Sequence, residues 1–135
     1  MKTISLILPI LNNPQGLNLF LNSVYLGNTI NAKIEIIIID QSDSNEIYHV
    51  CNKYEKKDNP FIIYKKSNDL GLSLNRNFGL QFATGDIIGF PDDDCTYYPD
   101  TLENILNCFL DVKFKNNDAV LGQIFDNHTH QPIIK

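Results

Sequence analysis

Three consecutive aspartates, Asp92 to Asp94, are the residues whose types and spacing best suit chemistry. They directly follow an apolar segment, residues 86–90, that is typical of a buried strand. In extended backbone, residues i and i+2 point to the same side, so Asp92 and Asp94 can face one point while Asp93 turns away. Two carboxylates on one side suit Mg²⁺ or Mn²⁺, which takes the rest of its shell from water and phosphate oxygens. The spacing therefore predicts a metal-diphosphate site, with a solvated acidic turn as the alternative.

The surrounding elements predict how these carboxylates are positioned. Apolar runs predict strands at residues 3–8, 34–39, 61–64, 86–90 and 119–125. Helical periodicity predicts helices that begin near Asn13-Pro14, Ser44 or Asn45, Leu70-Gly71 and Pro99-Asp100. The alternation favours an α/β fold, a mostly parallel sheet with helices on both faces. The third helix places Leu74, Phe78 and Phe82 on one apolar face.

Ligands of such sheets bind beyond the carboxyl ends of the strands. This rule selects the segments 9–12, 40–43 and 91–94, which follow the first, second and fourth predicted strands. Two of these three segments are acidic. An acidic rim is costly unless water or a cation neutralises it, which supports the metal interpretation.

Four segments resemble family 2 glycosyltransferases, in family order and at family-like spacing. ISLILPILNN resembles their opening strand and turn, and EIIIIDQSDSN their second strand with its acidic turn. GLSLNRNFGLQFATGDIIGFPDDD resembles their glycine-led Arg-Asn helix followed by the D-x-D strand end, and PDTLE resembles the start of the next helix. The resemblance runs from about Ile4 to Glu103. It implies a GT-A fold, Rossmann-like, here as a single domain over residues 1–135 that forms the N-terminal part of a longer enzyme.

The resemblance also implies the ligands and their residues. A nucleoside-diphosphate sugar would be held through Mg²⁺ or Mn²⁺, and the complete enzyme would transfer the sugar, with inversion, to a saccharide or lipid-linked acceptor. Asp94 and Asp92 would bind the metal. The residues implied for the nucleotide sugar are Pro9, Leu11, Asn12, Asp40, Gln41, Asn75, Arg76, Asp92 and Asp93.

Three departures from the family pattern affect these expectations. Leu11 stands where the family usually has an aromatic residue, so a stacking contact with the base is replaced by an apolar one. Gln41 stands where a second aspartate is common, and its amide can both donate and accept. A preference for uracil or thymine therefore cannot be assumed. Pro91 precedes the first aspartate and lacks an N–H, which predicts an unpaired strand end there.

The sequence does not identify a catalytic base. Inverting transfer needs a carboxylate that deprotonates the acceptor hydroxyl, and in this family it comes from a C-terminal segment beyond the matched residues. We therefore expect a shortened form or fragment that binds the donor and transfers nothing by itself. A noncatalytic nucleotide-binding remnant is compatible with this interpretation.

Composition limits the partners. The net charge of −5 argues against nucleic acid, and no stretch reaches the roughly 18 apolar residues of a membrane span. Three cysteines without a CxxC pair favour a reducing cytoplasm, with a peripheral place at the inner face of the membrane for the full-length protein. Cys95 is interpreted as filling space behind the metal loop. His128-x-His130 is interpreted as a polar turn because no third metal ligand is evident.

Two other classes of protein fit the sequence less well. A dinucleotide-binding oxidoreductase would carry G-x-G-x-x-G after the first strand, where LPILNNPQG stands instead. A receiver-like regulatory module would carry its acidic residues after the first strand and a lysine after the last. This chain carries its acidic residues after the second and fourth strands, which favours the transferase.

Overall fold

The computed structural model describes residues 1–54, 57–114, 116, 118–126 and 128–133. These residues fall into two compact units, 1–102 and 103–135, which are described separately. No helix in the described part of the chain is long and apolar enough to cross a membrane.

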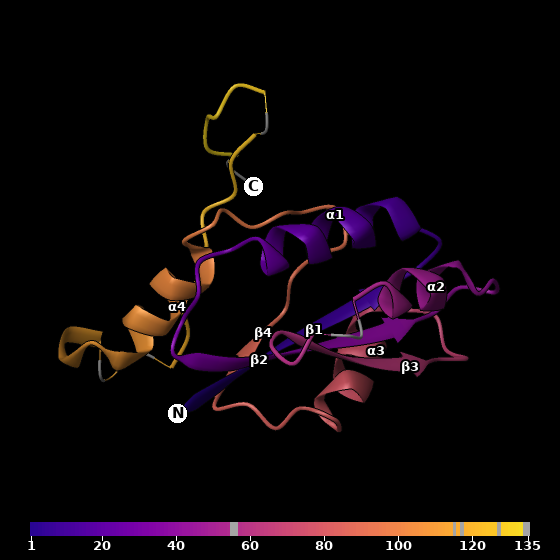
Figure 1. Ribbon diagram of the computed structural model, residues 1–135, viewed down its shortest axis with the longest axis horizontal. Helices are drawn as coiled ribbons and strands as arrows, with labels where there is room; N and C mark the ends of the chain where they lie inside the picture. Colours follow the sequence, from indigo (N-terminus) through magenta and orange to yellow (C-terminus); the bar gives the residue numbers. More distant parts are fainter. Residues whose placement is uncertain (55–56, 115, 117, 127, 134–135) are drawn as a thin grey trace. The chain divides into compact units, whose positions relative to one another are not determined.

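The first unit is built on a four-stranded, all-parallel sheet in the order β3-β2-β1-β4 (Figure 1). The strands are β1 (Lys2–Ile10), β2 (Ala32–Asp40), β3 (Phe61–Lys66) and β4 (Ile87–Gly89). Four of the five predicted strands are therefore confirmed, and three of them run further than predicted. β4 is instead shorter, because only three of its residues pair with β1.

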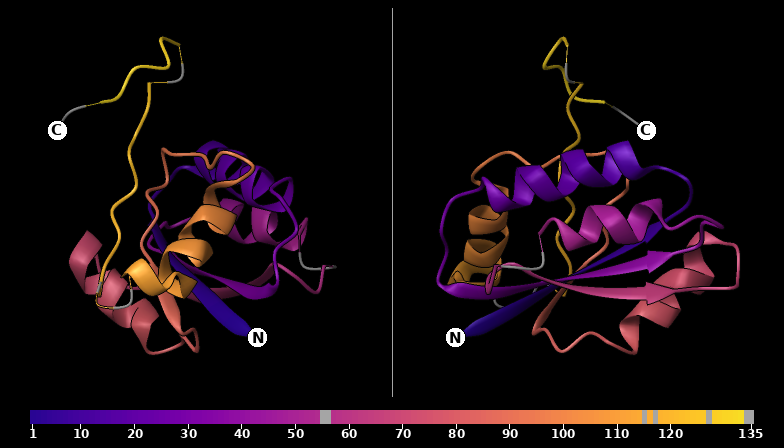
Figure 2. Two further views of the ribbon diagram at one scale, coloured as in Figure 1. Left: turned by 90° about the vertical axis from the view of Figure 1, so that its left-hand side faces the viewer. Right: turned by 45° about the vertical axis from the view of Figure 1, so that its right-hand side comes forward.

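Helices cover both faces of this sheet, as predicted. Helices α1 (Pro14–Tyr25) and α2 (Glu46–Asn52) lie on one face, and α3 (Leu72–Leu80) lies on the other (Figure 2). Helix α4 (Thr101–Leu110) begins at the end of the first unit. Asn13 caps α1 as expected, since its side chain accepts from the backbone N–H of Gly16 at 3.0 Å.

Helix α3 buries the apolar face that its periodicity predicted only in part. Asn75 and Gly79 are its buried residues, whereas Leu74 is 52% exposed. A Cβ on Gly79 would lie 2.4 Å from Cγ2 of Ile7, so the glycine lets the helix approach β1 closely. Phe78 and Phe82 pack against the core residues of the sheet, so the predicted apolar face is partly buried.

The fifth predicted strand, which falls in the second unit, is not present in the part that the structure describes. The apolar run at 119–125 is not a strand, because within the described residues its only strand-like pairing is an isolated antiparallel bridge between Phe125 and Pro132. A strand requires a ladder of backbone partners, and Leu121 instead is 96% exposed. Asp126 holds the following turn by accepting from the backbone N–H groups of His128 and Thr129. The 3₁₀ helix Val112–Phe114 precedes this segment.

Candidate functional site

The carboxyl ends of β1, β2 and β3 lie in register. Ile10 pairs with Asp40, and Asp40 pairs with Lys66. The loops that follow are joined by hydrogen bonds, because the backbone N–H of Asn12 donates to Oγ of Ser42 at 2.8 Å. Asn12 has a φ of 50°, a left-handed conformation that asparagine tolerates better than most residues. The register thus brings two of the predicted ligand-binding segments to one edge.

Asp40 is fully buried at this edge, with 0% exposure. Its Oδ2 accepts from the Tyr64 hydroxyl at 2.6 Å and from Nζ of Lys66 at 3.1 Å, and its Oδ1 accepts from the backbone N–H of Ser42 at 2.9 Å. Burial raises the pKa of the Asp40 carboxyl, but the hydrogen bonds from Tyr64, Ser42 and Lys66 outweigh it, so the pKa lies below its usual value. Both carboxylate oxygens are therefore already occupied by protein donors.

Gln41 connects the end of β2 to the start of α3. Its Oε1 accepts from the backbone N–H of Gly71 at 2.9 Å. Gly71 has a φ of 134°, which favours glycine and explains why this residue begins the helix. Gln41 is partly exposed, so its amide N–H groups can reach a ligand at the rim.

The opening turn is tied to the aspartate triplet. Nδ2 of Asn13 donates to the backbone oxygen of Asp93 at 3.2 Å, while the Oδ1 of the same side chain caps α1. One asparagine therefore fixes both the start of a helix and the loop after β4. Sequence reasoning used Asn13 only as a cap, and the contact with Asp93 required the fold.

Helix α3 reaches the same loop through Arg76. Nη2 of Arg76 lies 3.1 Å from Oδ1 of Asp92, and its guanidinium lies 5.5 Å from the centre of the Phe90 ring. The Asp92 side chain is 45% exposed, and the Nε of Arg76 is buried without a hydrogen-bond partner among the described residues. An ion pair this open contributes only about 0–1 kcal/mol, so a ligand can exchange it at small cost.

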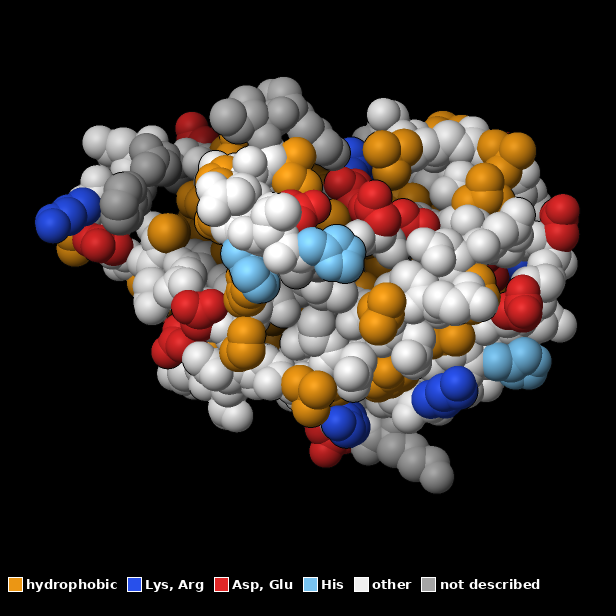
Figure 3. Space-filling view, turned by 90° about the horizontal axis from the view of Figure 1, so that it is seen from above, with side chains coloured by type: hydrophobic (Ala, Val, Ile, Leu, Met, Phe, Trp, Pro, Cys, Tyr) orange, Lys and Arg blue, Asp and Glu red, His pale blue; other side chains and the backbone are white. Residues whose placement is uncertain are grey.

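Asp92, Asp94 and Cys95 form the candidate metal cluster. One ligand atom from each lies within 4.8 Å of the others. The sulfur of Cys95 also lies 3.6 Å from Oδ1 of Asp94, and the residue is partly buried. Exposed carboxylates fit a hard, partly hydrated cation such as Mg²⁺ or Mn²⁺, whereas a thiol prefers softer metals. Figure 3 shows a face on which acidic side chains lie among hydrophobic ones.

The remaining predicted residues have different surroundings. Pro9 is buried within β1, and Leu11 is 47% exposed beyond its end. Asn75 is fully buried, and its Nδ2 donates to the backbone oxygens of Asp69 and Gly71. The sequence analysis missed Tyr64 and Lys66. Alignment of the ends of β2 and β3 was the signal that could have located them.

Known structures define the class of the fold. TarS residues 1–349 from S. aureus, in complex with UDP, superimposes with a TM-score of 0.73 at 21% identity, over 94% of this chain and 40% of that one. A mannosyltransferase from Pyrobaculum calidifontis, in complex with GDP-Man and Mn²⁺, gives a TM-score of 0.71 at 20% identity, over 81% of this chain and 32% of that one. The sheet and its helices are those of GT-A glycosyltransferases.

The sequence comparisons then identify the family. The chain belongs to glycosyl transferase family 2, whose model matches residues 5–131. It is 36% identical to the minor teichoic acid biosynthesis protein GgaB of Bacillus subtilis over 124 residues. It is 30% identical to the poly(ribitol-phosphate) beta-N-acetylglucosaminyltransferase TarP of Staphylococcus aureus over 127 residues. These matches cover 90% and 91% of this chain but span only 13% and 37% of the two relatives' lengths.

Proposed function

We propose that this chain is the donor-binding part of an inverting glycosyltransferase, which takes a nucleoside-diphosphate sugar and passes the sugar to the hydroxyl of a saccharide or lipid-linked acceptor. The observation that carries the proposal is the meeting of α3 and the loop after β4 at the Arg76–Asp92 contact. That contact sets a guanidinium beside carboxylates in the loop after β4, at the end of the strands where parallel α/β sheets commonly bind ligands. A metal ion and a guanidinium can together offset the charge of a diphosphate.

Asp92 and Asp94 would hold Mg²⁺ or Mn²⁺, as the geometry of their exposed oxygens permits. The metal, when bound, would neutralise the charge that develops on the diphosphate as it leaves the sugar. Arg76 would turn from Asp92 towards the diphosphate, because its pair with that carboxylate is weak and partly solvated. Asp93 would contact the ribose or sugar while the Asn13 side chain holds its backbone.

The nucleoside end would lie over the opening turn. Leu11 would cover the base by apolar contact, with Pro9 and Asn12 shaping the turn beneath it. The free amide N–H groups of Gln41 would donate to the base edge, since its oxygen is already bound to Gly71.

Asp40 and Asn75 would act on the nucleotide through their neighbours. Both side chains are fully buried and bound to protein groups. Asp40 orients the loop that carries Gln41, and Asn75 holds the backbone that begins α3. We therefore assign these two as positioning residues of the nucleotide site.

The chain by itself would bind the donor without transferring the sugar. A general base must lie within hydrogen-bond reach of the acceptor hydroxyl, and no carboxylate beyond Glu103 has a matching sequence context. We propose that a further segment supplies it, and that the working enzyme acts in the cytoplasm or at the inner face of a membrane. A noncatalytic nucleotide-binding role follows if no such segment exists.

Calorimetric titration tests the proposal. UDP, UDP-N-acetylglucosamine and GDP-mannose would be titrated into the chain with Mn²⁺ and, separately, with chelator. Metal-dependent binding of at least one of them is expected. Binding of a nicotinamide dinucleotide in their place, or robust sugar transfer by this chain alone, would respectively overturn the transferase assignment and the donor-only role.

A further inference from the structure

The amide of Gln41 has a fixed orientation just beyond the carboxyl end of β2. Its Oε1 accepts from the backbone N–H of Gly71 at 2.9 Å, and its own backbone N–H donates to the backbone oxygen of Ile10 at 2.9 Å. A backbone N–H can only donate, so the arm of the amide that faces Gly71 is the oxygen. The Nε2 arm is turned away from Gly71 and has no hydrogen-bond partner among the described residues. Gln41 therefore offers a hydrogen-bond donor to a ligand.

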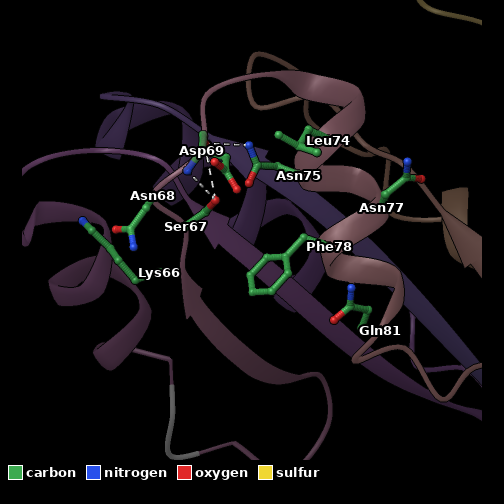
Figure 4. A pocket seen from close by; sticks show the side chains of 9 residues that line it. All are labelled: Lys66, Ser67, Asn68, Asp69, Leu74, Asn75, Asn77, Phe78 and Gln81. Atoms are coloured by element: carbon green, nitrogen blue, oxygen red, sulfur yellow. Dashed lines mark hydrogen bonds between the residues drawn. The ribbon is translucent and has the colours of Figure 1, made fainter.

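The backbone on both sides of the Gln41–Gly71 hydrogen bond is also held in place. Nδ2 of Asn75 donates to the backbone oxygens of Asp69 and Gly71, and Figure 4 shows Asn75 beside Asp69 near the start of α3. Ser42, which follows Gln41, is buried, and its Oγ accepts from the backbone N–H of Asn12. The Gln41 amide cannot turn over without losing its bond to Gly71. A side chain held in one orientation can distinguish a ligand acceptor from a ligand donor at little entropic cost.

The charges around Gln41 disfavour a phosphate group. Nζ of Lys66 already donates to the buried Asp40 carboxylate and to the backbone oxygen of Ser44, both at 3.1 Å. Asp43, two residues after Gln41, is an exposed aspartate. A phosphate would therefore meet a carboxylate and a cation that is already paired, and the repulsion would not be offset. An uncharged part of a ligand suits this position better.

The order of the strands separates Gln41 from the aspartate loop by a distance that suits a nucleotide. Strand β1 lies between β2 and β4, and neighbouring strands are about 4.8 Å apart, so β2 and β4 are about 10 Å apart. Asp92 and Asp94 follow β4, where the diphosphate lies in the proposed function. Leu11 follows β1 and is 47% exposed, which provides an apolar surface between the two. A nucleotide that extends across β1 from the aspartate loop would bring its uncharged end, the base, to Gln41.

The nucleobases differ in the group that they offer to such a donor. Uracil, thymine and guanine carry a carbonyl oxygen at the ring position where cytosine and adenine carry an amino group. The NH₂ group of Gln41 can donate to the carbonyl oxygen, whereas it would oppose an amino group. We propose that Gln41 is a specificity-determining residue, which selects a nucleotide with a carbonyl-bearing base over one with an amino-bearing base. This inference rests on the proposed function and adds to it the class of base that the donor carries.

Calorimetric titration of the parent chain with UDP, CDP, GDP and ADP, each with Mn²⁺, tests the proposal. The four ligands share the ribose and the diphosphate, so a ratio of their affinities isolates the contribution of the base. UDP should bind at least about fivefold more tightly than CDP, and GDP at least about fivefold more tightly than ADP, because an amino group would leave two donors facing each other. Equal affinities within both pairs would overturn the inference.

Gln41→Glu tests the residue itself. The glutamate keeps an oxygen that accepts from Gly71, but it replaces the NH₂ donor by an acceptor oxygen. The preference for UDP over CDP should therefore reverse, since an amino group would now donate to the carboxylate. The added charge weakens all four ligands alike, because they carry the same diphosphate, and so it cancels in the ratio.

Gln81→Glu, at an exposed position at the end of α3, makes the same change of charge and should keep the preference of the parent chain. The same ratio of UDP to CDP affinity in Gln41→Glu and in the parent chain would overturn the role of Gln41. The preference of the parent chain is measured without any variant, so the test does not depend on the folding of Gln41→Glu. If none of the four diphosphates bound to the parent chain, the proposed function would fail and this inference with it.

Discussion

The guanidinium of Arg76 lies 3.1 Å from the Asp92 carboxylate, so helix α3 on one face of the sheet contacts the aspartate loop after β4. In this pair the cation compensates one of the clustered carboxylates. A diphosphate could replace Asp92 as the partner of Arg76, while a metal ion replaces Arg76 as the partner of Asp92. The exchange is inexpensive because both side chains retain contact with water.

Arg76→Ala should affect UDP binding and Mn²⁺ binding differently. Loss of the guanidinium should weaken UDP binding in the presence of Mn²⁺ by at least about tenfold, because a charge-assisted contact contributes roughly 1.5–3 kcal/mol. The freed Asp92 should bind Mn²⁺ alone at least as well as before. Calorimetry with Mn²⁺ and with UDP measures both effects. The exposed Lys53→Ala is the charge-matched control, and equal UDP affinity in the two variants would contradict the role of Arg76.

Asp94→Asn should abolish the metal dependence of nucleotide binding. The change keeps the size of the side chain but removes the charge that a divalent ion requires. Titration with UDP should give the same weak affinity with and without Mn²⁺. Asp100→Asn, an exposed aspartate on the approach to α4, should retain the metal dependence. Retained dependence in Asp94→Asn would place the metal elsewhere.

Asp40→Asn should destabilise the fold in a pH-dependent way. The pKa of Asp40 is lowered in the folded state, so its contribution is fully present above the unfolded-state pKa of about 4. The contribution is lost as the pH falls through the folded-state pKa. The variant should therefore be less stable than the parent chain by about 1–3 kcal/mol near neutral pH, with a smaller difference in acid. Urea unfolding across this pH range measures the difference, and the exposed Asp43→Asn should show no such trend.

Glu35→Gln should destabilise the sheet at the turn before β4. The buried Glu35 carboxylate accepts from the Ser5 hydroxyl, from the backbone N–H of Thr84 and from the Thr84 hydroxyl. In the glutamine variant, an NH₂ group replaces one acceptor oxygen. This NH₂ group then faces an N–H or O–H donor of Ser5 or Thr84. We expect a loss of about 2–4 kcal/mol in the free energy of unfolding, measured with urea. Glu46→Gln, at the exposed first residue of α2, should change it by less than about 0.5 kcal/mol, and a similar small value for Glu35→Gln would refute the role of this network.

Gly79→Ala should also lower stability, even though alanine is the better helix former. The new Cβ would overlap Cγ2 of Ile7, and overpacking costs about 1–3 kcal/mol against a propensity gain of about 1 kcal/mol. Thermal unfolding should show a lower midpoint. At Gly122 nothing lies within 4 Å of an added Cβ, so Gly122→Ala serves as the control. A Gly79→Ala variant as stable as the control would mean that α3 can shift away from β1.

Local patterns were sufficient for most of the fold. The isoleucine run of β2, the Asn13-Pro14 start of α1 and the alternation of elements all predicted what the structure shows. The run at 119–125 has similar composition but is not a strand, because apolar composition does not supply a hydrogen-bonded neighbour. The α3 face was predicted only in part, since the periodicity of leucine and phenylalanine indicates neither the exposure of Leu74 nor the close approach that Gly79 allows.

The sequence by itself determined the family, the order of the strands along the chain and the aspartates that follow β4. Only the tertiary structure decided which polar groups remain available for a ligand. Asp40 and Asp94 are the same residue type in predicted loops of the same edge, yet Asp40 is enclosed by Tyr64 and Lys66 while Asp94 is exposed. The physical reason is that the periodic pattern of residue types depends only on neighbours along the chain. The burial and the partners of a side chain depend on strand register, which joins residues far apart in the chain.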